Sequence, residues 1–249
     1  MNAAPEIFVH ADGDTLAKAA AARIVTGVAD ALSARGRAHV VLTGGGIGTR
    51  VLAGLAAEPA REAIDWRTVD FWWGDERFEP AGHPDRNETG ARKALLDVLD
   101  VSPARVHLMR GPDGPDGDDP DASAARYAAE LARAAPEGSG VPAFDILMLG
   151  IGPEGHVASL FPDQPAVRDE RPVVAVRDSP KPPPTRISLT FGAITAAREV
   201  WVLASGEEKA EAVASAAAGT PRETLPAAGA RGTERTLFLV DEAAAAKIR

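Results

Sequence analysis

Short apolar runs rich in β-forming residues alternate with alanine-rich stretches along the chain, and this alternation constrains the fold more than any other feature. Runs of the first kind occur at 7–10, 39–43, 68–74, 105–109, 144–150, 172–176, 199–205 and 236–240. Stretches with helical spacing lie at 14–35, 49–57, 88–99, 121–135 and 206–217. Asp14, Asn87, Asp121 and Thr190 are residue types that cap helices, and they mark expected helix starts. Alternating strands and helices predict an α/β fold with a mostly parallel sheet and helices on both of its faces.

Two Gly/Pro-rich stretches interrupt this alternation, at 111–121 and 178–186. The first is rich in carboxylates, but their spacing does not match the EF-hand pattern, so we interpret it as a solvated loop. The prolines of the second exclude a helix and hold the chain extended. Neither stretch is long enough to separate two domains, and no internal repeat is visible. We therefore expect one α/β domain over residues 1–249.

The charge and composition exclude several classes of function. A formal net charge of −9 argues against a surface for nucleic acid or anionic membrane, since both select basic patches. The absence of cysteine excludes disulfides, thiolate catalysis and cysteine metal clusters. No apolar run approaches the roughly 18 residues of a membrane span, and no signal peptide is visible. We expect a soluble, cytoplasmic protein, and an anionic substrate would need a locally positive pocket.

Ligands of open α/β sheets collect at the carboxyl ends of the strands, so the loops that follow the strands matter most. In LTGGGIGTR (42–50) an expected strand runs through Gly44, Gly45 and Gly46 into a helix. A dinucleotide fingerprint would need glycine where Thr49 stands, and the lysine of an ATP-binding P-loop is missing. A tight turn is one interpretation. We favour a small phosphate cradle, because three adjacent glycines exceed what a turn requires.

The segment WWGDERFEP (72–80) places Asp75, Glu76 and Arg77 at the end of another strand. On charge alone, a surface cluster of salt bridges is the better interpretation. Their position after a strand raises the prospect that Arg77 or Asp75 points into the crevice. Asn87, which follows in the chain, could serve only as a helix cap.

In ILMLGIGPEGHVASLF (146–161) an apolar strand ends at Gly150, and a glycine-rich hinge then presents His156. A neutral imidazole is the natural general base at cellular pH. A lone histidine is more often a packed or exposed side chain, and only His156 sits in a glycine hinge at the end of a central strand. Pattern alone leaves both interpretations open for His156.

The segment SPKPPPTRISLT (179–190) holds Lys181 and Arg186 on stiff, extended backbone that would suit the gripping of an anion. A polar loop with two solvated cations is an equal alternative. Together, the four loops offer a glycine cradle, cations and a base, which suggests a small phosphorylated substrate. No G-x-S-x-G elbow and no metal-ligand cluster is present, so water activated by His156 is the simplest nucleophile.

The order of these motifs resembles the 6-phosphogluconolactonase family, with a match that runs from Val40 to about Lys209. The most specific element is GIGPEGHVASLFP, followed by TGGG, WGDER, NETGARKALL and SPKPPPTRISLT. The resemblance implies a modified Rossmann arrangement, the sugar-phosphate isomerase/deaminase-like fold. It implies hydrolysis of 6-phosphogluconolactone in the pentose phosphate pathway. It implies no cofactor and no metal, with a small molecule as the partner, and we expect a monomer.

Residue by residue, His156 resembles the catalytic histidine of the family, which is thought to deprotonate water. Arg77 and Asp75 match the family's DER motif, and Lys181 and Arg186 match the cations expected near the phosphate. Two departures concern the site. Many members have aspartate where this chain has Glu154, which we include among the catalytic candidates. Many also read SGGSTP where residues 43–48 read TGGGIG, so Thr49 or backbone N–H groups would replace two hydroxyl donors.

Two other functions are alternatives to this one. Amino-sugar-phosphate deaminases share the glycine loop and the histidine turn, but they have a glutamate five residues after the histidine. This chain has Phe161 there, which cannot carry a proton. A non-catalytic sugar-phosphate sensor of a transcription regulator would carry a DNA-binding segment, usually before the sensor. Few residues precede the first expected strand, and the net charge opposes DNA binding.

Overall fold

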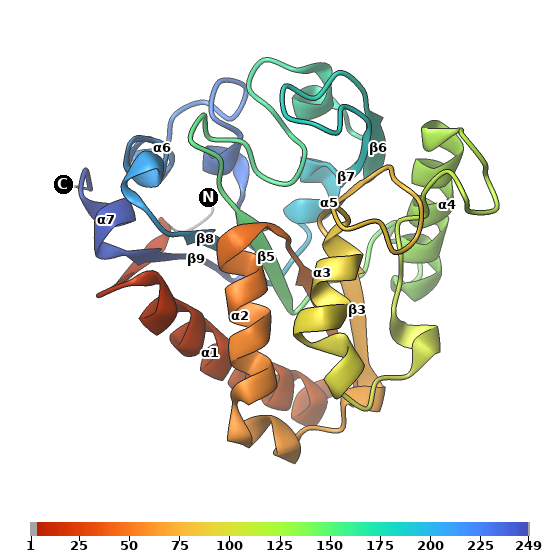
Figure 1. Ribbon diagram of the computed structural model, residues 1–249, viewed down its shortest axis with the longest axis horizontal. Helices are drawn as coiled ribbons and strands as arrows, with labels where there is room; N and C mark the ends of the chain where they lie inside the picture. The colour runs from red at the N-terminus through yellow and green to blue at the C-terminus, as the bar shows by residue number, and fades with distance from the viewer. Residues whose placement is uncertain (1–3, 249) are drawn as a thin grey trace.

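A six-stranded, wholly parallel sheet forms the centre of the computed structural model, which describes residues 4–248. The strand order is β1-β9-β8-β5-β2-β3 (Figure 1). The strands are β1 (Glu6–His10), β2 (Ala38–Leu42), β3 (Val69–Trp73), β5 (Ile146–Gly150), β8 (Glu199–Ala204) and β9 (Arg235–Asp241). Both β2 and β5 are almost wholly buried, as expected for central parallel strands.

Helices cover both faces of this sheet, as the sequence predicts. The side chain of Ile146 lies against a glycine of α1 (Gly13–Arg35), and α1 packs on α2 (Gly45–Ala57). Ile146 is in register with Val40, so the two share a face. Trp72 belongs to the opposite face, where its ring meets Tyr127 of α4 (Pro120–Ala134) at 5.9 Å. Figure 1 shows α1 and α2 side by side and α4 well away from them.

A second sheet is small and antiparallel, with the order β4-β7-β6. Its strands are β4 (Asp75–Arg77), β6 (Val173–Val176) and β7 (Arg186–Leu189). The apolar run at 172–176 therefore belongs to this sheet and not to the parallel one. The run at 105–109 is not a strand: only Val106 forms an isolated bridge, to Phe71. A 3₁₀ turn at Pro103–Arg105 takes up the start of the run, and beyond it the His107 N–H donates to the carbonyl of Phe71 in β3.

The other helices are short. They are α3 (Asn87–Ala94), α5 (Phe191–Ile194), α6 (Ala210–Ala217) and α7 (Glu242–Ala245). Single 3₁₀ turns occupy Pro59–Ala63, Trp66–Thr68, Leu96–Val98, Pro103–Arg105, Pro165–Arg168, Glu207–Lys209 and Pro226–Gly229. No helix within residues 4–248 combines the length and the apolar character that a membrane crossing needs.

The expected helix caps are correct at one position and wrong at three. Thr190 caps α5 through its side chain. The caps of α1 and α4 are Asp12 and Asp119, each two residues before the expected one, because these carboxylates reach the free N–H groups of the first turn. Asn87 is the first residue of α3, and its side chain serves another purpose.

The topology brings two of the motif loops together. The chain passes from β2 to β3 on one side, and later places β5 on the other side of β2. The strand order thus reverses between β2 and β5, and a crevice opens at the carboxyl ends of strands at such a point. The glycine loop leaves β2 there, and the histidine hinge leaves β5.

Candidate active site

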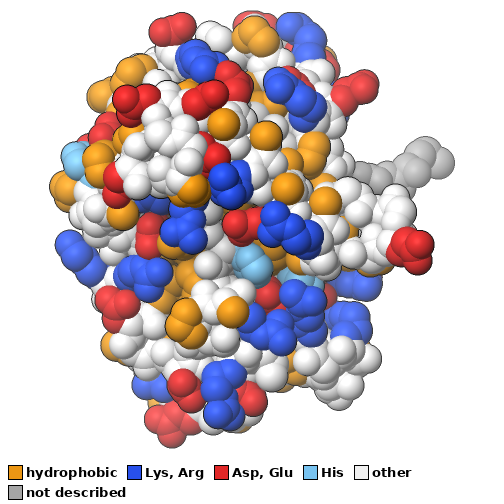
Figure 2. All heavy atoms as spheres, turned by 90° about the vertical axis from the view of Figure 1, so that its right-hand side faces the viewer, with side chains coloured by type: hydrophobic (Ala, Val, Ile, Leu, Met, Phe, Trp, Pro, Cys, Tyr) orange, Lys and Arg blue, Asp and Glu red, His pale blue; other side chains and the backbone are white. Residues whose placement is uncertain are grey.

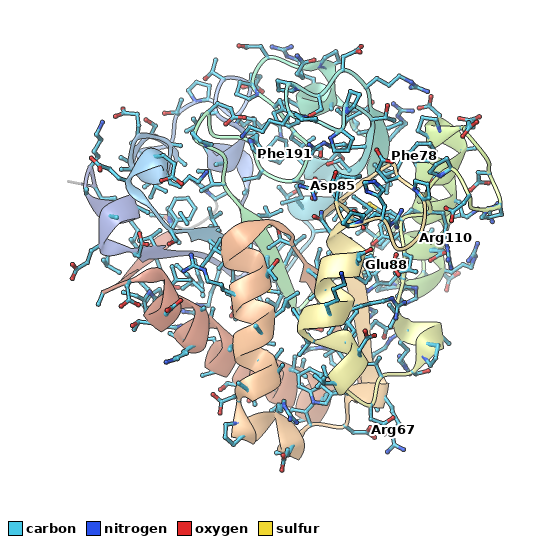
Figure 3. The ribbon with its side chains drawn as sticks, viewed as in Figure 1. Arg67, Phe78, Asp85, Glu88, Arg110 and Phe191 are labelled. Atoms are coloured by element: carbon cyan, nitrogen blue, oxygen red, sulfur yellow. The ribbon has the colours of Figure 1, made fainter. Side chains whose placement is uncertain are left out.

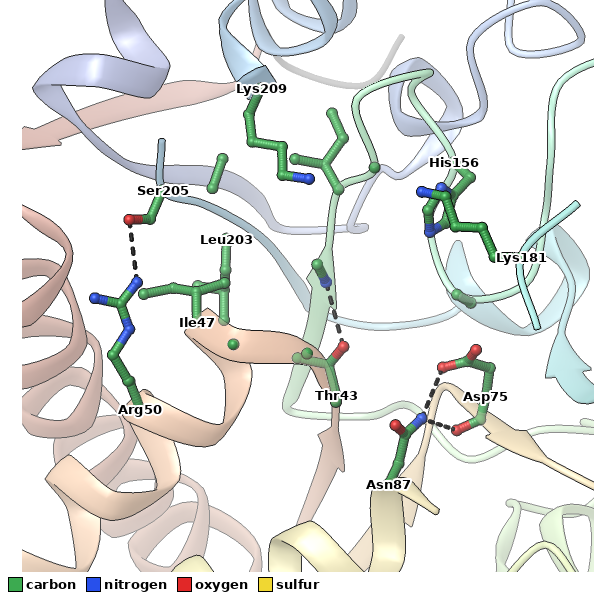
Figure 4. A pocket seen from close by; sticks show the side chains of 18 of the residues that line it. Thr43, Ile47, Arg50, Asp75, Asn87, His156, Lys181, Leu203, Ser205 and Lys209 are labelled. Carbon is green, nitrogen blue, oxygen red and sulfur yellow. Dashed lines mark hydrogen bonds between the residues drawn. The ribbon is translucent and has the colours of Figure 1, made fainter. Parts of the chain in front are cut away.

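A cavity of about 530 Å³ lies at the carboxyl ends of β2, β3, β5 and β8 (Figure 4). Its walls come from segments that are far apart in the sequence: 43–47 with Arg50, Asp75 with Arg77 and Asn87, 150–152 with His156 and Ala158, 181–182 with Arg186, and 203–205 with Glu208 and Lys209. All four loops singled out in the sequence therefore meet in one place. A hydrogen bond from the Gly150 N–H to Thr43 Oγ1 (3.2 Å) ties the glycine loop to the hinge.

The three glycines form the start of a helix rather than a separate loop. Gly44 is the N-cap of α2 and has no side chain to cap it, and Gly45 and Gly46 follow in the first turn. The first N–H groups of a helix have no partner within it, so they are free to bind an anion. A Cβ atom on Gly44 would lie 1.9 Å from Asn87 Oδ1, which explains why glycine is needed there. Thr49 is exposed and lines an adjoining depression, outside this cavity.

His156 projects from the hinge into the cavity, with 17% of its side chain exposed. Its Nδ1 lies 2.9 Å from Glu154 Oε1, and its ring centroid lies 4.6 Å from that of Phe161. A Cβ atom on Gly152 would lie 1.9 Å from His156 Nδ1, so a larger residue would displace the imidazole. The hinge glycine and Phe161 together fix the orientation of the ring.

The environment keeps His156 neutral at cellular pH. Burial lowers the pKa of His156, Lys181 lowers it further, and the Glu154 carboxylate only partly opposes them. With the carboxylate on Nδ1, the neutral ring carries its proton there, which leaves the Nε2 lone pair free. The arrangement suits a general base.

Glu154 links His156 to Lys181. Burial raises the pKa of Glu154, but its hydrogen bonds and the Lys181 charge lower it more, so the net shift is downward. Lys181 Nζ lies 3.0 Å from Glu154 Oε1. The carboxylate does not line the cavity itself, and it acts through these two neighbours.

Asp75 and Glu76 are buried rather than exposed in a surface cluster. Asp75 Oδ2 accepts a hydrogen bond from Ser159 Oγ at 2.6 Å, and Asn87 Nδ2 donates to the Asp75 carbonyl at 2.8 Å. Glu76 accepts from the N–H groups of Arg77, Asn87 and Glu88, all within 2.8 Å. These contacts hold the start of α3 against the cavity.

The cations expected near the phosphate differ in their surroundings. Arg186 is 5% exposed and donates to the carbonyls of 181–183, with Nη1 3.8 Å from Asp75 Oδ2. Arg77 lines the cavity while its Nη1 donates to the carbonyl of Asp85. Lys181 has 43% of its side chain exposed, and its Nζ contacts Glu154.

Two further cations in the cavity were not predicted from the sequence. Arg50, on α2, donates to Ser205 Oγ at 3.1 Å, and Lys209 points its Nζ into the cavity (Figure 4). Burial lowers the pKa of Lys209. Arg50 follows the end of β2 and Lys209 follows the end of β8. A cation that follows a strand end is the sequence signal that could have indicated both. Within residues 4–248, no group of three or more His, Asp or Glu side chains is arranged to hold a metal ion.

A model of the family described as glucosamine-6-phosphate isomerases/6-phosphogluconolactonase matches residues 11–239. The chain belongs to this family. Among curated proteins, the 6-phosphogluconolactonase of Streptomyces coelicolor is 57% identical over 251 residues, which cover all of this chain and 96% of that one. The 6-phosphogluconolactonase of Mycobacterium leprae is 49% identical over 249 residues, which cover all of this chain and 99% of that one.

A solved structure of 6-phosphogluconolactonase from Trypanosoma brucei superposes with a TM-score of 0.83 at 30% identity, over 98% of this chain and 99% of that one. The family that the motifs indicate is thus confirmed, together with its α/β sugar-phosphate isomerase/deaminase-like fold. The family description covers isomerases and lactonases, so the site must distinguish between the two activities.

Proposed function

We propose that this protein hydrolyses 6-phospho-D-glucono-1,5-lactone to 6-phospho-D-gluconate, the second step of the oxidative pentose phosphate pathway, with water activated by His156. The observation that carries the proposal is the pairing of His156 Nδ1 with Glu154 in the cavity, which leaves Nε2 free to accept a proton. The relatives that match this chain over its whole length bear the name of that activity.

In the proposed reaction, His156 Nε2 takes a proton from water while the water oxygen bonds to C1 of the lactone. The carbonyl π-electrons move to the oxygen and form an oxyanion. When the oxyanion collapses, the bond from C1 to the ring oxygen breaks, and that oxygen takes the proton from His156. The net change is one lactone plus one water to one hydroxy acid, and the histidine is regenerated. General-base catalysis supplies about 10²–10⁴-fold, which is adequate for a lactone that already hydrolyses unaided.

The cations of the cavity have two proposed roles, at the lactone carbonyl and at the 6-phosphate. Lys181 is held beside His156 by Glu154, so we place it near the lactone carbonyl, where a positive charge stabilises the oxyanion. The N-terminus of α2, with Arg50 and Lys209, lies across the cavity and suits the 6-phosphate. Arg77 and Arg186 complete the positive lining.

Phe161 favours the lactonase over the deaminase. It is 2% exposed, packs on His156, and has no group that could pass a proton. The deaminases have the glutamate of their proton relay at this position. Lactone hydrolysis needs no proton carrier there.

The direct test is a coupled assay in which fresh 6-phosphogluconolactone is generated and its loss is followed above the spontaneous background. We expect rapid loss that requires the protein, and no ammonia release from glucosamine 6-phosphate. Lactone loss at the background rate would reject the proposal. The proposal includes a monomeric, cytoplasmic enzyme of one domain over residues 1–249, and the mass in solution tests the monomer.

A further inference from the structure

A second cavity, of about 380 Å³, lies at the other end of the sheet from the active site. Arg37, which directly precedes β2, and residues near the end of α4 contribute to its walls. Figure 1 places α4 at the right, and Figure 2 views the molecule from that side. The view shows histidine side chains in a hollow near the centre of the face, with Lys and Arg side chains around them. The cavity is lined by Arg37, Pro103, Ala104, Val106, His107, Arg110, Glu130, Arg133 and Ala134.

One buried carboxylate organises the floor of this cavity. Asp70, 1% exposed, lies 2.6 Å from Arg37 Nε, 2.7 Å from Arg105 Nη1 and 2.9 Å from His107 Nε2. The His107 ring stacks on Trp72 with 3.7 Å between centroids and 6° between planes. These contacts hold three basic side chains in fixed positions, so a ligand that used them would lose little side-chain entropy on binding.

The surroundings of His107 favour its protonated, positively charged form. Burial lowers the pKa of His107, but the hydrogen bonds and charges of Asp70 and Glu130 raise it more, and the net shift is upward. Arg37 and Arg105 already face Asp70. The Asp70 carboxylate therefore pairs with two arginines, which are always charged, and with a histidine that protonates readily.

Two more arginines stand at the rim. Arg110 and Arg133 are exposed, and within residues 4–248 their guanidinium groups form no ion pair or hydrogen bond. Figure 3 shows Arg110 on the α4 side of the molecule. A purely structural role explains the network around Asp70, because it attaches residues 105–107 to β3. A structural role also explains Arg133, whose positive charge is favourable in the C-terminal turn of α4. Neither role explains Arg110, and neither explains why Arg110 and Arg133 line the same cavity.

The charges in and around this cavity do not cancel. Asp70 and Glu130 oppose four arginines, Arg37, Arg105, Arg110 and Arg133, and protonated His107 adds to the excess. The whole chain carries a formal charge of −9, so this local positive excess runs against its general character. Guanidinium groups bind phosphate through paired, planar hydrogen bonds. The apolar wall consists of small residues and offers no aromatic face for a nucleobase.

We propose that this second cavity binds the phosphate groups of a compact small molecule, at a site separate from the active site. Arg110 and Arg133 hold the anion at the rim, and Arg37 and His107 receive it at the floor. The sources of such a group include a phosphorylated metabolite and short inorganic polyphosphate, which share this chemistry.

The test uses inorganic pyrophosphate as the probe and follows the ring C–H signals of the histidines by NMR, at constant ionic strength in chloride. The His107 signals report the second cavity, and the His156 signals report the active site. Single His→Gln variants assign them. We expect the His107 signals to shift saturably, and the variant R110Q/R133Q to weaken this titration about tenfold or more.

The variant R67Q/R168Q removes the same charge from exposed positions elsewhere and should titrate as the wild type does. Unfolding temperatures of both variants establish that they are folded. The proposal is overturned if the His107 signals do not move, or if R110Q/R133Q titrates with unchanged affinity. A titration with a sugar phosphate distinguishes the sources: tighter binding than that of pyrophosphate indicates a metabolite, and weaker binding indicates polyphosphate.

Discussion

His156 Nδ1 and Glu154 Oε1 lie 2.9 Å apart, and the same oxygen lies 3.0 Å from Lys181 Nζ. The carboxylate thus orients the imidazole and holds a cation beside it. Aspartate, which the family resemblance leads one to expect at this position, is shorter by one methylene group. The longer side chain of Glu154 reaches both partners from the hinge.

Replacing Glu154 by Gln should lower kcat while the protein stays folded. The amide carries no charge to stabilise the imidazolium, and it binds Lys181 less well. The fall in kcat cannot exceed the full contribution of general-base catalysis, which is about 10²–10⁴-fold. We expect kcat to fall at least tenfold. Steady-state kinetics with E223Q, an exposed control, measure it. Unchanged kcat in E154Q would exclude a positioning role for Glu154.

The pH dependence of kcat/KM should report the depressed pKa of His156. The base must be neutral, so activity rises with pH through this pKa and is level above it. Because the pKa of His156 lies below its ordinary value of 6.5, the rise should be complete near neutral pH. In E154Q the rise should move to still lower pH, since the carboxylate favours the protonated ring. A midpoint above 6.5 for the wild type, after subtraction of background hydrolysis, would contradict the assignment.

Replacing Lys209 by Met should raise KM about tenfold or more and change kcat little. A partly buried ammonium group that binds the phosphate in ground and transition states alike contributes uniform binding. K247M, which removes an exposed lysine paired with Glu211, is the matched control. A fall in kcat at constant KM would instead assign Lys209 to the reacting end of the substrate.

The stability of the protein should fall in acid because of His39. Burial lowers the pKa of His39 to about 4, and Trp72 Nε1 donates to its Nδ1 at 3.2 Å, which requires the neutral ring. The contribution of neutral His39 to stability is complete above pH 6.5, which is its pKa in the unfolded chain. It is lost progressively as the pH falls towards 4. Its size is at most about 3 kcal/mol. Urea unfolding of wild type, H39Q and the partly exposed control H83Q measures this contribution. An equal loss of stability in acid for H39Q would refute the role of His39.

The alternation of strands and helices was enough to predict the parallel sheet, because buried strands and amphipathic helices have different periods in the sequence. The strand at Asp75–Arg77 was not predictable in this way. Its three residues are charged. Asp75 and Glu76 are nevertheless buried, because Ser159 binds the Asp75 carboxylate and backbone N–H groups of α3 bind that of Glu76. Conversely, the run at 105–109 has strand composition, but Arg105 belongs to the 3₁₀ turn that begins at Pro103.

The part of the site that the sequence predicts is the part carried by local motifs. Gly44–Gly46 and His156 depend on the chain next to them, and they line the cavity as expected. The direction of a long side chain on a helix depends instead on packing. Arg50 turns towards Ser205, and Thr49, its neighbour, turns out of the cavity. Lys209 reaches the cavity because β8, which precedes it, pairs with β5.

The most direct test of the mechanism is the turnover of folded H156A on freshly generated 6-phosphogluconolactone, corrected for spontaneous hydrolysis. We expect kcat to fall by about 10²–10⁴-fold, the contribution of a general base, while the unfolding temperature stays close to that of the wild type. H83A, in which a partly exposed histidine outside the cavity is removed, should retain full activity. Turnover of H156A near the wild-type value would show that His156 does not activate the water.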